Sequence, residues 1–109
     1  MNSEIRFTQH FKKEYKRLAK KYASLKNDML SLIEVLKENP TSGTDLGGNV
    51  YKIRMAVSSK GRGKSGGARI ITYFVIKDNT VYLLSIYDKS EEANISDNEI
   101  KKILKEIEN

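Results

Sequence analysis

The sequence predicts an α+β fold in which an N-terminal helix hairpin packs on one face of a small, mainly antiparallel sheet of about four strands, followed by a C-terminal helix. Two observations lead to this prediction. Apolar residues recur at helical spacing in the N-terminal part and alternate farther on, and all seven glycines lie between Gly43 and Gly67, where the pattern changes. The 109 residues are expected to form a single domain, residues 1–109, with one modest core.

The N-terminal part is expected to form a short edge strand and two helices. Residues 4–7 alternate, and Thr8 can cap the helix that follows. Ser24 is the expected N-cap of the second helix, which Pro40 ends after Glu38. A very short turn joins the helices, so they form a hairpin with one apolar seam. The seam consists of Phe11, Tyr15, Leu18, Tyr22, Leu25, Met29, Leu32, Ile33 and Leu36.

Three longer strands and a last helix are expected in the remainder. Residues 51–57 alternate, with Lys52 and Arg54 on the open face of a half-buried strand. Residues 69–77 are rich in β-branched and aromatic side chains, as in a central strand, and residues 80–87 form a hairpin with them. A capping box opens a final amphipathic helix; its residues are Ser96 and Glu99.

The positive charge is concentrated in the middle of the chain. Residues 50–69 carry six Lys and Arg and no Asp or Glu, a balance that equals the net charge of +6 for the whole protein. A solvated surface is the plain interpretation of such a run. An anionic partner, however, relieves the mutual repulsion of these cations, and this favours nucleic acid.

The composition also bears on location and cofactors. The chain has no Cys, so disulfides and thiolate metal sites are excluded. The N-terminus lacks the apolar core of a signal peptide, and no apolar run approaches the ~20 residues of a membrane span. A cytoplasmic protein without a membrane association, a metal or a cofactor is therefore expected.

The segment KGRGKSGGAR, residues 60–69, contains the Gly-Lys-Ser that ends a nucleotide-binding P-loop. A P-loop also requires a glycine where this chain has Ser58, and a helix after the serine. A β-rich run follows Ser65 instead, so the sequence argues against ATP or GTP binding. A glycine-rich cationic loop between two strands suits the backbone of RNA. The cations expected to bind it are Lys60, Arg62 and Lys64.

The strands offer Lys, Arg and Tyr for chemistry, because the chain has a single His and no metal-ligand spacing. Strand parity places Arg69 and Tyr73 on one face of the second long strand. It places Ser85, Tyr87 and Lys89 on one face of the third. If these faces coincide with the open face of the first long strand, cations from three strands converge.

Such a site can cleave RNA without a metal. The 2′-hydroxyl attacks its own phosphate, and cations stabilise the additional charge of the phosphorane. Neighbouring cations can lower the pKa of a lysine so that it acts as a base. A Tyr or Lys can give a proton to the leaving 5′-oxygen.

These motifs resemble a known family. They are the run Tyr51 to Arg54, the run KGRGKSGGARIITYFV, and YLLSIYDKSE with an Asn-Ile-Ser lead into the last helix. They resemble the RelE/ParE superfamily of type II toxin–antitoxin toxins over nearly the whole chain, and most of all its HigB-type branch. The resemblance implies a RelE-like fold and an mRNA interferase, a metal-independent endoribonuclease that cuts mRNA in the ribosomal A site and so inhibits translation.

The resemblance implies a role for each motif residue. Lys52 and Arg54 fall where the family has two cations on the first long strand. Arg69 falls where it has the arginine that contacts the scissile phosphate. Lys89 matches a basic residue just after the last strand, and Tyr87 belongs to the Tyr-x-Lys of the HigB-like branch.

The segment after the last long strand departs from the family pattern. Some members carry a catalytic Tyr there, whereas residues 91–95 are Glu-Glu-Ala-Asn-Ile. Other branches use His and Asp near this point, and only Asp88 corresponds. The expected catalytic residues are Arg54, Arg69, Lys89, Tyr87, Lys52 and Asp88, and the expected RNA-binding residues are Lys60, Arg62, Lys64 and Tyr73.

The implied partners are a HigA/RelB-like antitoxin, the 70S ribosome, mRNA and rRNA. The antitoxin either covers the basic face or wraps the helices. Two alternative functions use the same scaffold: a ParE-like poison of DNA gyrase, and a ribosome- or RNA-binding module without catalysis. The converging cations favour the nuclease over both.

Overall fold

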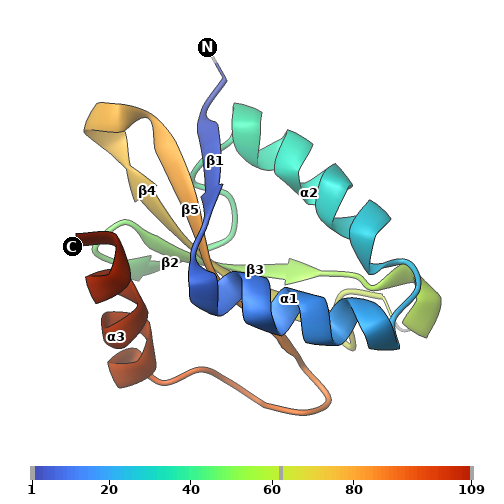
Figure 1. The fold of residues 1–109 in the computed structure, drawn as a ribbon. Helices are drawn as coiled ribbons and strands as arrows, with labels where there is room; N and C mark the ends of the chain where they lie inside the picture. Colours follow the sequence, from blue (N-terminus) through green and yellow to red (C-terminus); the bar gives the residue numbers. More distant parts are fainter. Residues whose placement is uncertain (1, 62, 109) are drawn as a thin grey trace.

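The fold is described from a computed structural model, which describes residues 2–61 and 63–108 (Figure 1). Two helices precede most of the sheet and a third ends the chain, in agreement with the predicted α+β class. The helices are α1 (Gln9–Lys21), α2 (Leu25–Glu38) and α3 (Asp97–Glu108). The strands are β1 (Glu4–Phe7), β2 (Thr44–Gly47), β3 (Val50–Met55), β4 (Ala68–Val75) and β5 (Thr80–Asp88). Short 3₁₀ turns follow β3 and β4, at Ser58–Lys60 and Ile76–Asp78.

The strands form one five-stranded sheet in the order β1-β5-β4-β3-β2. β1 lies parallel to β5, and the other neighbours are antiparallel. The sequence predicted about four strands and missed β2. This strand, Thr-Asp-Leu-Gly, shows no apolar alternation and all four of its residues are exposed, so the periodicity gives no signal.

Local hydrogen bonds explain where the helices begin. The Phe11 amide donates to the Thr8 hydroxyl oxygen at 3.0 Å, which is the predicted N-cap of α1. At α3, the Glu99 amide donates to the Ser96 hydroxyl oxygen at 3.1 Å, as the capping box requires. Ser24 is the N-cap residue of α2, as predicted, although its side chain makes no capping hydrogen bond.

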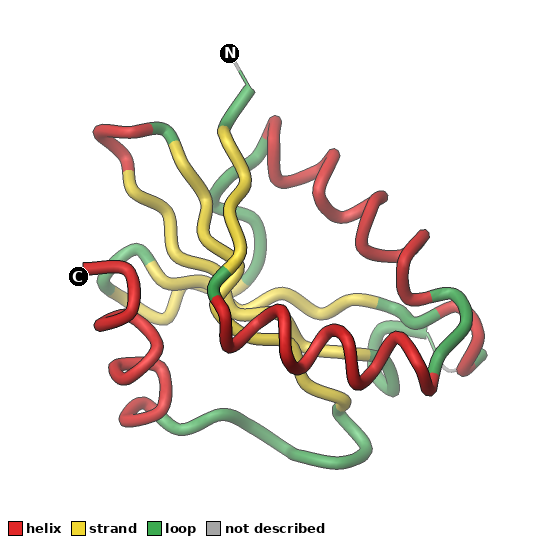
Figure 2. Tube along the Cα trace, in the orientation of Figure 1, coloured by secondary structure: helices red, strands yellow, loops and turns green. Residues whose placement is uncertain are grey.

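The helices cover the two faces of the sheet unequally. The hairpin of α1 and α2 covers one face, and α3 lies against the other (Figures 1 and 2). On the hairpin face, Phe11, Leu18 and Leu36 pack against strand residues that include Ile70 and Leu83. The smaller cluster on the α3 face contains Val50, Ile71, Leu84, Tyr87, Ile95, Ile100 and Ile103. Within the described ranges, no helix is long and apolar enough to cross a membrane.

Candidate active site

Three side chains line up across the central strands on the α3 face of the sheet. The register places Arg54 of β3 opposite Arg69 of β4, and Arg69 opposite Tyr87 of β5. Directly opposed residues of antiparallel strands share a face, so these residues form one line, called here the cross-strand row. Lys52 lies on the same face, two residues before Arg54. The strand faces therefore coincide as the parity argument expected.

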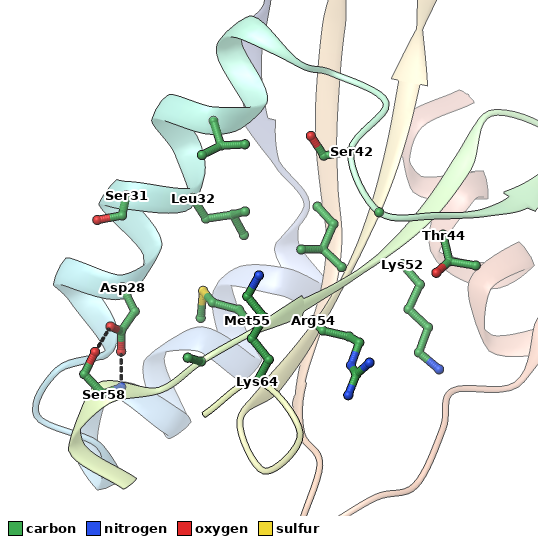
Figure 3. A pocket seen from close by; sticks show the side chains of 14 residues that line it. Asp28, Ser31, Leu32, Ser42, Thr44, Lys52, Arg54, Met55, Ser58 and Lys64 are labelled. Carbon is green, nitrogen blue, oxygen red and sulfur yellow. Dashed lines mark hydrogen bonds between the residues drawn. The ribbon is translucent and has the colours of Figure 1, made fainter. Parts of the chain in front are cut away.

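Arg54 and Lys52 are the accessible cations of this face. Arg54 is exposed, and no ion pair or side-chain hydrogen bond is found for it within residues 2–61 and 63–108. Both side chains extend from β3 to the same side, away from α2 (Figure 3). The Lys52 ammonium is half-buried and donates to the Asn94 side-chain oxygen at 3.0 Å. Arg54 thus presents an unneutralised guanidinium to solvent.

Arg69 is buried, with only 5% of its surface exposed. Its guanidinium donates to the carbonyls of Lys64 at 2.8 Å, Ala68 at 3.3 Å and Ser65 at 3.4 Å. These acceptors are neutral, so they satisfy the donors without cancelling the charge. Arg69 therefore holds the glycine-rich loop between β3 and β4, called here the basic loop, against the sheet. It also contributes a fixed positive charge to the row.

Tyr87 is 3% exposed, and its hydroxyl donates to the Asn94 side-chain oxygen at 3.3 Å. Burial raises the pKa of the Tyr87 phenol above its ordinary value, although the positive charge of Arg69 opposes the shift. The phenol is therefore neutral at physiological pH and can act as a proton donor. Asn94, which binds both Tyr87 and Lys52, was not among the predicted site residues.

A groove of about 610 Å³ lies between α2 and β3, on the hairpin side of the sheet, whereas the Lys52 and Arg54 side chains extend away from α2 (Figure 3). Lys52, Arg54 and Lys64 lie along it. Its opposite wall belongs to α2, where Asp28 accepts hydrogen bonds from the Ser58 amide at 3.1 Å and hydroxyl at 2.7 Å. These donors are neutral, so Asp28 keeps its negative charge, but the three cations outnumber it among the described lining residues.

The basic loop connects β3 to β4, and no helix follows its Gly-Lys-Ser, in agreement with the argument against a P-loop. Lys64 is exposed on this loop. Gly67, at its end, needs to be glycine because a Cβ atom there would lie 2.1 Å from the Met55 carbonyl oxygen. Arg62, predicted to bind RNA, lies outside the described residues.

Lys60 and Asp88 lie together, away from the cross-strand row. The Lys60 ammonium binds the Asp88 carboxylate at 2.7 Å, and their side chains are only 8% and 2% exposed. Tyr22, Ser90 and the Ser90 amide also donate to this carboxylate. Burial alone raises the pKa of Asp88, but these hydrogen bonds outweigh it and hold the pKa well below its ordinary range. This pairing favours a structural role for both groups, and the expected RNA contact of Lys60 and catalytic role of Asp88 stay predictions.

Two predicted residues occupy the margins of the site. Tyr73 is half-buried and packs against the apolar cluster beneath α3, next to Val50 in the register. Lys89 follows β5, and its ammonium donates to the Ala93 carbonyl at 3.4 Å. Tyr73 is thus part of the packing, while Lys89 stays near the end of the row.

The chemistry of this site depends on Lys, Arg and Tyr. In the part of the chain that the structure describes, no three His, Cys, Asp or Glu side chains gather as metal ligands would. Asp88, the carboxylate nearest in sequence to the row, faces the hairpin. The arrangement can bind a phosphate, stabilise extra negative charge on it and donate a proton.

Comparisons with known proteins identify the family and the fold. A family model described as "RelE toxin of RelE / RelB toxin-antitoxin system" matches residues 6–108. The chain is similar to a mutant E. coli toxin RelE in the free state, at 15% identity over 98% of this chain and 99% of that one, with a TM-score of 0.65. It is also similar to the isolated E. coli RelE toxin, at 17% identity over 94% and 97% of the two chains, with a TM-score of 0.59. These structures share its fold, and because the family model matches nearly the whole sequence, the chain belongs to the RelE toxin family of toxin–antitoxin systems.

Proposed function

We propose that this toxin is a ribosome-dependent endoribonuclease that cuts mRNA in the ribosomal A site and so stops translation. The observation that carries the proposal is the cross-strand row, with Arg54, Arg69 and Tyr87 on one face and Lys52 beside them. Two arginines and a lysine can bind the phosphate of RNA through charge-assisted hydrogen bonds, and a neutral phenol can donate a proton to the leaving oxygen. Membership of the RelE family, and a glycine-rich loop that resembles the one in the HigB-type branch, support the same assignment.

The reaction is an internal transfer at phosphorus. The 2′-oxygen bonds to the adjacent phosphorus while the bond from phosphorus to the 5′-oxygen breaks, so the products are a 2′,3′-cyclic phosphate and a 5′-hydroxyl. One proton passes from the 2′-hydroxyl to solvent water, one is added to the 5′-oxygen by the proton donor, and solvent restores the proton of that donor. The step therefore requires charge stabilisation and proton transfer, and the chain supplies side chains for both.

The proposed roles follow from accessibility and charge. Arg54 and Lys52 bind the scissile phosphate, and the buried charge of Arg69 stabilises the phosphorane from beneath. Tyr87 protonates the leaving oxygen, because its phenol lies in the row opposite Arg69 and carries a proton. Lys89 supports the backbone of the message at the end of the row.

The loop and the paired residues complete the assignment. Lys64 and Arg62 bind mRNA or rRNA backbone. Lys60 and Asp88 stabilise the base of the loop, since their charges satisfy each other in a buried ion pair. Tyr73 supports β4 through its packing beneath α3.

The antitoxin is proposed to bind an apolar groove of about 340 Å³ between α1 and α2. Phe7 and Leu30 expose 40% and 53% of their surfaces there. Lys12 and Lys26 also line the groove, so an acidic amphipathic helix fits it better than RNA or a second copy of this cationic chain. The other lining residues are Phe11, Tyr15, Met29 and Ile33. This choice favours an antitoxin that wraps the helices over one that covers the basic face.

Primer extension on a defined mRNA in a purified translation system tests the nuclease. The protein is added with and without ribosomes, and cuts inside codons are expected only when ribosomes are present. An intact message together with halted replication in cells would favour the gyrase poison instead. Ribosome binding without cleavage would favour the RNA-binding module.

A further inference from the structure

The segment between β5 and α3, residues 89–96, passes beside the cross-strand row and brings one amide into it. The side-chain oxygen of Asn94 accepts from the Lys52 ammonium at 3.0 Å and from the Tyr87 hydroxyl at 3.3 Å. The amide of Ile95 also donates to it, at 3.1 Å. One neutral oxygen thus joins side chains from β3 and β5, the two strands that flank β4.

The residues that follow Asn94 fix its position, although Asn94 itself is exposed. Ile95 is 6% exposed and lies in the apolar cluster with Tyr87 and the core face of α3. Ser96 then caps α3 through the Glu99 amide. A buried side chain and a helix cap therefore anchor the backbone at Asn94, so its contacts with the sheet are not those of a free loop tip.

We infer that Asn94 is a positioning residue of the proposed active site, because its amide oxygen holds the Lys52 ammonium and the Tyr87 phenol side by side. The inference rests on the proposed nuclease function. It also gives a role to the segment where this chain lacks the tyrosine that the family resemblance leads one to expect.

An amide suits this role for a physical reason. Lys52 has a long, flexible side chain, and ordering such a side chain costs up to ~2 kcal/mol of rotamer entropy. A neutral acceptor restricts it without cancelling the charge that the phosphate requires. Asn94 orders the donors before RNA arrives, and the oxygens of the nucleotide can then replace the amide as acceptor.

The test compares three variants in ribosome-dependent cleavage of a defined mRNA. Asn94→Ala removes the acceptor, Asn94→Gln keeps a neutral amide acceptor, and Asn98→Ala changes an exposed asparagine of α3 near the same loop. Loss of one positioning hydrogen bond is expected to lower kcat about 3- to 10-fold with little change in KM. Asn94→Gln and Asn98→Ala should stay close to wild type. Full activity in Asn94→Ala, or an equal loss in Asn94→Gln or Asn98→Ala, would overturn the inference.

A second readout separates this inference from the nuclease proposal. The amide accepts from the neutral phenol and not from the phenolate, so Asn94→Ala should lower the pKa of Tyr87. NMR of ¹³C-labelled tyrosine, assigned with Tyr87→Phe, measures that pKa in wild type, Asn94→Ala and Asn98→Ala. An unshifted Tyr87 pKa would reject the contact whether or not the protein cleaves RNA. A shifted pKa in a wild-type protein that does not cleave would reject the nuclease function and leave the contact standing.

Discussion

Tyr87 and Asp88 are neighbours at the end of β5, yet they serve opposite faces of the sheet. Asp88 faces the helix hairpin, where it forms a buried ion pair with Lys60. Tyr87 faces α3, in line with two arginines that have no carboxylate partner among the described residues. On the hairpin face, Asp88 therefore neutralises the charge of Lys60 within the protein. On the α3 face, only a bound anion can neutralise the charges of the two arginines.

The difference separates a structural cation from a functional one. A buried charge is tolerated when it is paired and hydrogen-bonded, and such a pair has little left to offer a ligand. An accessible cation without a partner can bind a phosphate without first breaking an ion pair within the protein. In the composition, Lys60 and Arg54 each contribute one positive charge to the same segment. The fold distinguishes them, because it buries and pairs Lys60 and leaves Arg54 exposed.

The largest effect is expected from Arg54→Ala. Removing this cation should lower mRNA cleavage about 100- to 1,000-fold, as for the loss of one transition-state donor elsewhere. The free energy of unfolding should change by less than about 0.5 kcal/mol, because Arg54 is exposed. Arg6→Ala, at another exposed strand arginine, serves as the control and should cleave normally. Near-normal cleavage in Arg54→Ala would contradict the row as the active site.

On the other face, Asp88→Asn should affect stability and not chemistry. It leaves the buried Lys60 ammonium without its counter-charge, so the free energy of unfolding should fall by about 3 kcal/mol. Urea denaturation measures this change, with the exposed Asp78→Asn as the control. At a temperature where both variants are folded, cleavage should remain within about threefold of wild type. A selective loss of cleavage in folded Asp88→Asn would restore Asp88 as a catalytic residue.

The same ion pair predicts a pH dependence. The pKa of Asp88 in the folded protein lies below its value in the unfolded chain, so its contribution to stability is fully present above about pH 4. It is lost progressively as the pH falls further, toward the folded-state pKa. The difference in unfolding free energy between wild type and Asp88→Asn should therefore shrink on acidification. A difference that stays constant between pH 6 and about pH 2 would contradict the pairing.

The periodicity of apolar residues in the sequence predicted the helices and the faces on which the strand residues lie. The spacing of Leu25, Met29 and Leu36 placed the second helix, and alternation brought Arg54, Arg69 and Tyr87 to one face. These predictions succeeded because side-chain direction in helices and strands repeats with a fixed period.

The contacts that periodicity missed are non-local. Lys60 meets Asp88 across 28 residues of chain, through a 3₁₀ turn that no sequence pattern indicated. Asn94 reaches Lys52 across 42 residues, from a loop without periodicity. Such contacts depend on where whole elements pack, and a single sequence shows only the order of those elements.

A substitution on the hairpin face can test antitoxin binding without changing the cross-strand row. Leu30→Glu places an acid in the apolar groove, where it removes apolar contact and repels an acidic partner. Affinity for the antitoxin should fall about 30-fold, while mRNA cleavage stays unchanged. Ile76→Glu, at an exposed apolar residue in the turn after β4 and outside both grooves, is the matched control. Equal antitoxin affinity in both variants would point to the basic face as the antitoxin site.

The smallest effect is expected from Lys64→Ala. The backbone carbonyl of Lys64 binds Arg69, whereas its side chain is exposed, so the substitution removes a charge and leaves the loop held to the sheet. Ribosome-bound mRNA should bind only about threefold more weakly, and the slope of log affinity against log salt should fall by about 1. Lys77→Ala, at an exposed lysine in the turn after β4, should leave that slope unchanged. If Lys64→Ala instead lowers kcat as Arg54→Ala does, the loop belongs to the catalytic face, and the division between a binding loop and a catalytic row is wrong.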